Sequence, residues 1–450
     1  MRLQVGQELA QDLLKRAEKR GASMGDVLMA ESDSVGVNVR LGEVQSISQA
    51  CEKRLGLRLF FGHSVASTVT SDISETSLER LLDQTCVLAA ATAQDEYSGL
   101  PDAAELATGL PDLDLMDASA RGVTIEQKIE AARLAEETAL QFDARINNSE
   151  GAGFQGSFNR VIYANSVGFS GEYEGSVFNL SVTPVAMLNG AMERDHWFSS
   201  TRKYDLLDSP AAVGREAARR VMRRLGARRV RTQRVPVVFD PQTAKALLGV
   251  LSRAISGHAL YQRASFLYGK LGERIASEMV NVIDDGTIPG ALGSKPFDAE
   301  GVLMRKKSIV EDGVLTSYLL DTYSARKLGQ STTGNASRSV GTAPVAAPTN
   351  LYLVPGRHTP EEILASVDEG FYATELMGFG VNPVTGDYSQ GAAGIWIQNG
   401  ALAFPVEEVT IAGNLSDMLR QIEMVGNDLH MHSKIASPTI KIARMTVGGT

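Results

Sequence analysis

The chain has 450 residues, a net charge of −9 and only two cysteines, Cys51 and Cys86. This length exceeds one hydrophobic core, so we expect two or three domains. The acidic balance argues against a protein that coats nucleic acid, and two cysteines exclude both a disulfide framework and a cysteine-based zinc site.

The first segment, residues 1–21, has the pattern of an amphipathic helix. It carries charges of both signs and lacks the apolar core of a signal peptide. No uncharged apolar run reaches 18 residues, so we expect no membrane span and a cytoplasmic protein. Residues 35–50 and 53–70 then alternate between apolar and polar side chains, which predicts half-buried strands of an antiparallel sheet. A capping box at 76–79 predicts the start of another helix.

The middle of the chain begins with a second capping box, Thr124 to Gln127, which predicts a helix ending near Phe142. Residues 145–200 have the composition of successive strands joined by asparagine and glycine turns. A serine followed by a proline, at Ser209, predicts a third helix that ends near Gly226.

The last part begins with a short apolar strand, residues 235–240. Asp240 and the proline after it are typical of a helix start, and we expect that helix to include residues 247–262. Strand patterns dominate afterwards, with a hairpin at 308–320 that turns on Glu-Asp-Gly, and one more helix capped by Thr359.

Together these patterns predict an α+β fold with mostly antiparallel sheets. An N-terminal α/β-type domain is followed by a β-rich C-terminal domain. We expect boundaries at residues 1–110, 111–232 and 233–450, with the middle segment packed against the first.

Nine arginines lie between Arg215 and Arg234. On the predicted helix, an apolar stripe faces away from an arginine stripe. The apolar stripe comprises Val213, Ala217, Val221 and Leu225, and the other face carries Arg215, Arg219 and Arg223. Such a stripe could meet phosphates, but no aromatic residues are interleaved with it. We interpret it as a solvated face or a subunit contact, with nucleic acid as the weaker alternative.

Two further stretches invite a functional interpretation that the residues do not support. Residues 378–394 are glycine-rich but lack the G-x-G-x-x-G spacing and a helix after them, so tight turns or close approach of a bound chain explain the glycines better. The adjacent carboxylates of Asp284 and Asp285 would point to opposite faces of a strand, so we expect a turn there rather than an acid/base pair.

Histidines are the remaining candidates for chemistry. A metallopeptidase helix requires two histidines one turn apart and a glutamate beside the first. His258 has no histidine one turn before or after it, so we interpret it as structural. His430 and His432 would share one face of a strand and could chelate a metal together with a third ligand from elsewhere, although an ordinary packing role is the simpler interpretation.

Several blocks resemble the TldD/PmbA family of peptide-processing proteins. They are residues 165–175, 244–277, 282–302, 317–329, 378–400 and 405–419. The likeness covers nearly the whole chain, is most specific between 237 and 415, and favours the PmbA (TldE) branch.

The resemblance implies that the TldD branch carries HExxxH in the helix, with a further zinc ligand from a C-terminal cysteine. At the corresponding positions this chain has Ser252 and Gly257 in place of the ligands and Arg253 in place of the glutamate. His258 lies one residue past the second position, about 100° further around a continuous helix. The C-terminal half contains no cysteine. We therefore assign no catalytic residue and no metal to this chain, with His258, His430 and His432 as weak candidates.

The resemblance implies a function as the partner of a TldD-like subunit that supplies zinc. Such a heterodimer would degrade unfolded peptides or mature modified antibiotic peptide precursors. A homodimer of the chain alone stays open. Two alternatives stay open. One is a hydrolase in its own right with a non-family metal site, and the other is a regulatory binding protein linked to DNA gyrase. No residue of the sequence is assigned to peptide binding.

Overall fold

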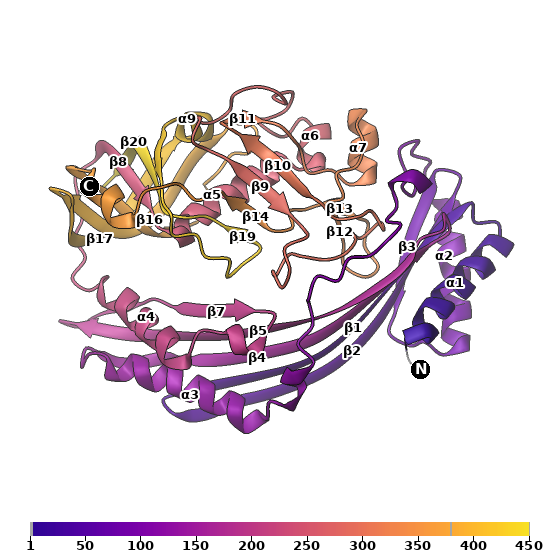
Figure 1. Ribbon diagram of the computed structural model, residues 1–450, viewed down its shortest axis with the longest axis horizontal. Helices are drawn as coiled ribbons and strands as arrows, with labels where there is room; N and C mark the ends of the chain where they lie inside the picture. Colours follow the sequence, from indigo (N-terminus) through magenta and orange to yellow (C-terminus); the bar gives the residue numbers. More distant parts are fainter. Residues whose placement is uncertain (1–2, 379, 450) are drawn as a thin grey trace.

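The computed structural model describes residues 3–378 and 380–449. Met1 and Arg2 of the first predicted helix, Phe379 of the glycine-rich stretch, and Thr450 lie outside the described residues. The described chain combines helices with largely antiparallel sheets, which confirms the predicted α+β fold. One long curved sheet forms the N-terminal part, and a barrel with a smaller sheet forms the C-terminal part (Figure 1).

The first sheet has the strand order β3-β2-β1-β4-β5-β6, and β7 also pairs with β5. All of its pairings are antiparallel. The long strands bend around the C-terminal part, so that the concave face of the sheet is turned toward it (Figure 1). The strands are β1 (Met24–Arg40), β2 (Glu43–Phe61), β3 (Ser64–Thr70), β4 (Ile146–Asn165), β5 (Ser170–Leu188), β6 (Ala191–Arg194) and β7 (Trp197–Thr201).

Helices cover the other face of this sheet in two pairs, each with its own apolar core. The pair at one end buries Leu13 and Leu82 against Leu57, because alternate residues of β2 point to the same face. At the other end, the second pair packs on Phe154 and Phe178. The helices are α1 (Leu3–Lys19), α2 (Glu75–Ala91), α3 (Ile125–Gln141) and α4 (Pro210–Met222), and the 3₁₀ turns are Ala103–Glu105, Ser119–Gly122 and Tyr204–Leu206.

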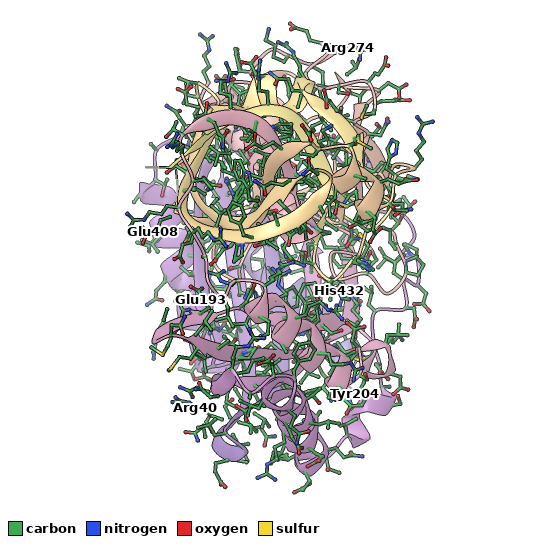
Figure 2. All side chains as sticks on the ribbon, turned by 90° about the vertical axis from the view of Figure 1, so that its left-hand side faces the viewer. Arg40, Glu193, Tyr204, Arg274, Glu408 and His432 are labelled. Atoms are coloured by element: carbon green, nitrogen blue, oxygen red, sulfur yellow. The ribbon has the colours of Figure 1, made fainter. Side chains whose placement is uncertain are left out.

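The C-terminal part contains a closed barrel. Its strand order is β17-β16-β15-β8-β20-β18, and an additional pairing between β17 and β20 closes the ring, which Figure 2 shows end-on. Only the pairing of β15 with β8 is parallel. The strands are β8 (Gln233–Phe239), β15 (Glu369–Met377), β16 (Asp387–Gln398), β17 (Ala401–Asn414), β18 (Ile422–Val425) and β20 (Ile440–Gly448).

A second, five-stranded sheet of order β11-β10-β9-β14-β19 lies beside the barrel. Helix α5 (Pro241–Ala254) contacts strands of both and contributes Leu248 and Leu251 to their shared core. The other elements are β9 (Val282–Asp285), β10 (Lys306–Glu311), β11 (Val314–Leu315), β12 (Ala336–Ser337), β13 (Val345–Ala346), β14 (Leu351–Leu353), β19 (Ile435–Ala436), α6 (Gly257–Tyr261), α7 (Thr322–Leu328), α8 (Pro360–Ala365) and α9 (Leu415–Arg420).

Most predicted helix starts are confirmed, because the N-caps of α3, α4, α5 and α8 are the predicted residues. The hairpin turn is also confirmed, with Asp312 and Gly313 both at positive φ. The capping box predicted at 76–79 is wrong. α2 already begins at Glu75, because the Asp72 carboxylate accepts hydrogen bonds from the backbone of Ser74 and the hydroxyl of Ser77 and fixes an earlier start.

The turn predicted at Asp284 and Asp285 starts later than predicted, because both residues end strand β9 and the turn occupies residues 286–287. Their carboxylates have separate partners, as expected for neighbours in a strand. Asp284 accepts hydrogen bonds from Asn335 and Thr349, and Asp285 accepts from Thr287. No helix of the described residues is long and apolar enough to cross a membrane.

Candidate functional site

The segment that resembles the zinc-motif helix is two helices rather than one. α5 ends at Ala254, and Ser256 is the N-cap of α6. The Ser256 hydroxyl oxygen accepts a hydrogen bond from the backbone N–H of Ala259 and so starts a new helix instead of extending α5. The backbone N–H of Gly257 donates to Leu319 instead of continuing the helix. The prediction of one continuous helix that carries His258 is therefore wrong.

The three motif positions do not fit a zinc ion. Ser252 is buried, and its hydroxyl donates to the backbone carbonyl of Gly249 at 2.9 Å. Arg253 is exposed and adds a positive charge. At Gly257, a Cβ atom would lie 2.0 Å from the hydroxyl oxygen of Ser324, so the position has no room for an imidazole. No step of a zinc-dependent reaction can be assigned to these residues.

His258 belongs instead to a series of contacts that joins the two parts of the chain. The Tyr261 hydroxyl lies 2.9 Å from His258 Nδ1, and the Tyr261 ring packs edge-on against Tyr323 with centroids 5.6 Å apart. The Tyr323 hydroxyl donates to Asp95 Oδ2 at 2.7 Å. Burial, and next the hydrogen bond to Asp95, raise the pKa of Tyr323, so its phenol stays protonated at neutral pH.

These side chains border a cavity of about 1170 Å³ between the N-terminal sheet and the C-terminal part. Strand β3 lines it with Val65 and Ser67, and β3 pairs only with β2, so its other edge is free of strand partners among the described residues. The Lys327 ammonium lies 3.7 Å from Asp95 Oδ1 and sits over the ring of Tyr97, so it brings a positive charge to the cavity. The cavity therefore combines aromatic side chains, fixed polar groups and residues of the edge strand β3.

Buried charges lie at the boundary of this cavity. Arg58 Nε donates to Asp26 Oδ2 at 2.7 Å, and Arg338 Nη2 donates to Asp26 Oδ1 at 2.6 Å, so one carboxylate bridges the sheet and the C-terminal part. Glu300 accepts from the backbone N–H of Thr322 and lies 3.9 Å from Arg58. Burial raises the pKa of Glu300 to about 7, although the charge of Arg58 opposes the shift.

His430 and His432 lie in the loop between β18 and β19 rather than on a strand, so that prediction is wrong. The loop is bent by Asp428, whose carboxylate accepts from the backbone and the hydroxyl of Thr439. The two rings still stack, with centroids 5.8 Å apart, and His432 lies at the junction between the barrel and the first sheet (Figure 2). Burial lowers the pKa of His432. Within residues 3–378 and 380–449, no three His, Cys, Asp or Glu side chains are grouped so that they could hold a metal ion.

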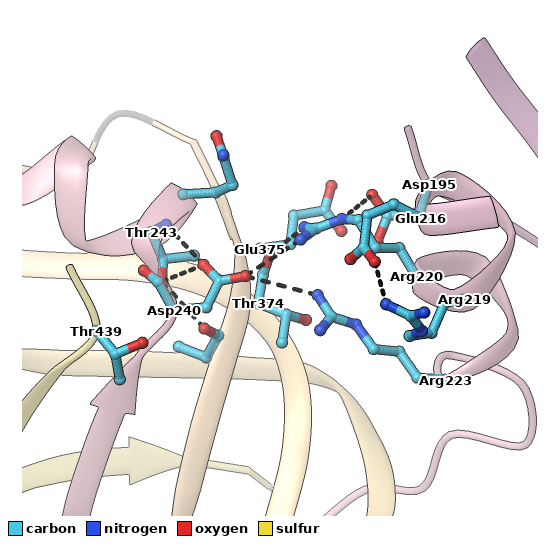
Figure 3. Close-up of polar contacts among 12 residues, drawn as sticks. Asp195, Glu216, Arg219, Arg220, Arg223, Asp240, Thr243, Thr374, Glu375 and Thr439 are labelled. Atoms are coloured by element: carbon cyan, nitrogen blue, oxygen red, sulfur yellow. Dashed lines mark hydrogen bonds and ion pairs between the residues drawn. The ribbon is translucent and has the colours of Figure 1, made fainter. Parts of the chain in front are cut away.

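The arginine-rich helix α4 is divided between solvent and an internal junction. Arg215 and Arg219 are exposed, as predicted. Arg223 is not on a solvated face, since its Nη2 lies 3.5 Å from Asp240. Arg220 is buried and bridges Asp195 at 3.3 Å and Asp240 at 3.4 Å (Figure 3). Because Asp240 is the N-cap of α5, these ion pairs tie α4 to the start of the helix that carries the motif positions.

Sequence reasoning missed the residues that build the large cavity. Tyr261 and Tyr323 lie in blocks quoted for the family resemblance, so a signal for them was present. Asp95 lies in a stretch with the composition of a loop, and the pairing of Asp26 with Arg338 joins residues far apart in the chain. No local pattern predicts such contacts.

The curved sheet, the closed barrel and the helix that breaks after Ala254 define the class of protein to which this chain belongs. Three family descriptions match it. "PmbA/TldA metallopeptidase domain 1" matches residues 25–93, the "central domain" matches 119–225 and the "C-terminal domain" matches 232–449. The chain belongs to the PmbA/TldD metallopeptidase family and is a PmbA-like member of it.

Individual relatives agree with this assignment. The "Metalloprotease PmbA" of Escherichia coli O157:H7 is 35% identical over 94% of this chain and 92% of its own length. The crystal structure of a putative modulator of DNA gyrase from Bacteroides thetaiotaomicron has a TM-score of 0.92 at 29% identity and covers 98% of both chains. TldE from Thermococcus kodakarensis has a TM-score of 0.89 at 21% identity, over 98% of this chain and 100% of its own, and supports the fold alone.

Proposed function

We propose that this chain is the supporting subunit of a two-chain metallopeptidase and that a TldD-like partner supplies the zinc site. The pair degrades or matures unfolded peptides, such as modified antibiotic peptide precursors. The observation that carries the proposal is the close packing at Gly257, together with Ser252 and Arg253 at the other motif positions. A family member with these residues contributes something other than the metal to catalysis.

We assign to this chain one wall of the substrate chamber. The large cavity offers the free edge of β3 at Val65 and Ser67, to which an extended peptide can add as a further strand. Backbone hydrogen bonds of this kind are largely independent of sequence, which suits a peptidase that accepts many unfolded chains. A cavity of about 1170 Å³ is too small for a folded protein, so a chamber of this kind would admit unfolded chains only.

A second strand edge without a partner supports a docking surface for the TldD-like chain. β3 pairs only with residues 55–61 of β2, so residues 43–54 have one hydrogen-bonding edge without a strand partner among the described residues. This edge is exposed and includes Ile47. Uncovered edges promote unspecific association, so proteins normally cover them. A homologous TldD-like chain has a sheet of the same kind to offer, and we assign it as the occupant.

Cleavage assays of each chain alone and of the mixture test the proposal. The peptide substrate must be unfolded, and a chelator identifies metal-dependent cleavage. We expect chelator-sensitive cleavage only in the mixture. Cleavage by this chain alone would contradict the supporting role and would favour a site built around His430 and His432. A photoreactive peptide should label Val65, Ser67 or Tyr261, and labelling confined to the outer surface would contradict the β3-edge assignment.

A role in binding nucleic acid receives less support. Of the arginines that suggested it, Arg220 and Arg223 form ion pairs with Asp240, and Arg224 pairs with Glu193 at 3.0 Å. These three of the nine arginines are engaged within the chain and are therefore less available for phosphate contacts. Phosphate contacts would make DNA affinity fall steeply with salt concentration, and we expect no such binding.

A further inference from the structure

A second cavity, of about 500 Å³, lies between the concave face of the first sheet and loops of the C-terminal part. This volume is within the range of about 300–1,000 Å³ that is typical of small-ligand pockets. Six cations line it, and three of them come from different loops: Arg202, Lys295 and Lys434. Neither the large cavity nor the motif helix includes them.

Among the described residues, no carboxylate forms an ion pair with any of these three cations. Arg202 donates only to backbone carbonyls, among them Ala291 at 2.9 Å and Leu292 at 3.0 Å. Lys295 donates to the carbonyl of Ala336 at 3.2 Å. The backbone carbonyl of Lys434 accepts a hydrogen bond from Leu351, and the Lys434 side chain forms no hydrogen bond or ion pair with another described residue. The chain has a net charge of −9, so carboxylates outnumber cations, and a buried cation without a carboxylate partner is unusual in it.

The cations are also close enough to repel one another. Burial lowers the pKa of Lys295, Asp298 offsets part of this, and the charge of Lys434 lowers it further. Burial and the charge of Arg202 lower the pKa of Lys434. Bringing like charges together in a partly desolvated space costs free energy. A bound anion would offset that cost.

The other charged side chains of the wall have partners within the chain. Arg54 pairs with Glu52, Arg160 with Glu31 and Glu172, and Arg338 with Asp26, while Asp298 accepts hydrogen bonds from backbone N–H groups. Apolar side chains and a phenol lie beside them. Leu28 and Phe297 line the cavity from the sheet and from the facing loop. Tyr163 lines it as well, is fully buried, and its hydroxyl has no hydrogen-bond partner among the described residues. The cavity therefore suits a ligand with one anionic group beside an apolar group, rather than a highly charged polyanion.

We propose that this cavity binds the C-terminal carboxylate of a peptide, with Lys434, Lys295 and Arg202 facing the carboxylate and with Leu28 and Phe297 contacting the last side chain. This inference rests on the proposed function in peptide processing, because that function supplies the peptide. A chamber that holds a chain end would orient the peptide and would favour substrates with a free C-terminus.

Binding to the isolated chain tests the inference by titration calorimetry with two probes, N-acetylated alanyl-leucyl-leucine as the free acid and as the C-terminal amide. We expect the acid to bind roughly ten-fold more tightly than the amide, because charge-assisted hydrogen bonds are lost in the amide. Lys434→Gln should weaken binding of the acid by a similar factor and leave the amide unchanged. Lys434→Arg should retain binding.

Lys270→Gln is the matched control, since Lys270 pairs with Glu273 on the surface, and it should bind the acid like the unmodified chain. Equal affinity for acid and amide, no measurable binding of the acid, or an unchanged affinity in Lys434→Gln would overturn the inference. Inorganic phosphate that binds more tightly than the acid would also overturn it. Cleavage by the two-chain mixture is measured separately, so a failure of carboxylate binding is distinguishable from a failure of the proposed function.

Discussion

At the scale of single residues, the motif helix is defined by how closely its glycines are packed. Two glycines lie near each other in sequence but have different surroundings. A Cβ at Gly257 would meet Ser324 at 2.0 Å, whereas a Cβ at Gly249 would have no neighbour within 4 Å. Packing therefore requires glycine at position 257, and a single substitution cannot place a metal-binding side chain there.

Replacing Gly257 with alanine should destabilise the chain by about 1–3 kcal/mol, the usual cost of forcing extra atoms into a packed core. Gly249→Ala is the matched control and should stabilise α5 by up to about 1 kcal/mol, because alanine is the better helix former. Urea unfolding of both variants measures the difference. Equal stability of the two variants would contradict the packing argument.

Restoring the family motif should fail to restore zinc binding. The variant Ser252→His, Arg253→Glu, Gly257→His places the right residue types in the right sequence positions, but the helix break and Ser324 prevent the second imidazole from reaching the first. We expect no stoichiometric zinc in the purified, folded variant by elemental analysis. One zinc per chain would show that the motif positions are compatible with a metal site.

Glu300 should give the stability of the chain a measurable pH dependence. Its pKa is raised to about 7 in the folded chain, so the folded state binds its proton more tightly than the unfolded state does. The contribution of Glu300 is therefore complete below about pH 4.5, its ordinary pKa, and is lost as pH rises through 7.

The variant Glu300→Gln is the reference, because glutamine stays neutral at every pH. Relative to this variant, the free energy of unfolding of the unmodified chain should fall by on the order of 3 kcal/mol between pH 4.5 and 8. Urea unfolding at several pH values gives this difference. A difference between the two chains that is independent of pH, or that grows as pH rises, would contradict the raised pKa.

At the scale of elements, sequence patterns correctly predicted the features that depend on neighbouring residues, namely the buried faces of strands and the starts of helices. Alternation identified the buried face of β2, and caps at Thr124, Ser209 and Asp240 identified helix starts. The break between α5 and α6 was not predicted, because apolar residues continue across it and only Ser256 marks the new start. The loop at His430 was mistaken for a strand, because its bend depends on a distant threonine, Thr439.

The junction between α4 and α5 depends on a buried ion pair whose loss should be costly. Arg220→Met leaves Asp195 and Asp240 without their buried partner and should destabilise the chain by about 3–5 kcal/mol. Arg219→Met is the control on the same helix, since Arg219 is exposed and pairs only with Glu216, and it should change stability by less than about 0.5 kcal/mol. Thermal and urea unfolding distinguish the two, and similar losses in both would argue against a structural role for the buried pair.

The free edge of β2 can be tested with a native cysteine. Cys51 is exposed in the middle of the segment 43–54, whereas Cys86 of α2 is half-buried and away from that edge. If the partner covers the edge, a maleimide should label Cys51 more slowly in the mixture than in the chain alone, with Cys86 unaffected. Unchanged labelling of Cys51 in an active mixture would place the partner elsewhere.

At the scale of the whole molecule, the two parts meet through charges and aromatic rings contributed by distant segments. Asp26 and Arg338 form one such contact, and Asp95 and Tyr323 form another. The fold class was predictable because strand alternation and helix caps depend on residues close together in the sequence. The family was predictable because whole blocks of the sequence resemble it. The cavities were not predictable, since they exist only where the sheet meets the C-terminal part. The domain boundaries at 110 and 232 stay predictions.

The most direct test of the account is the zinc content of this chain and of its complex with a TldD-like partner, measured by native mass spectrometry. We predict no bound zinc on the isolated chain and one zinc per heterodimer, retained when His258, His430 and His432 are all changed to alanine. One zinc on the isolated chain, lost in the His430→Ala, His432→Ala variant, would contradict the assignment of a supporting subunit and would identify this chain as a metal-binding hydrolase.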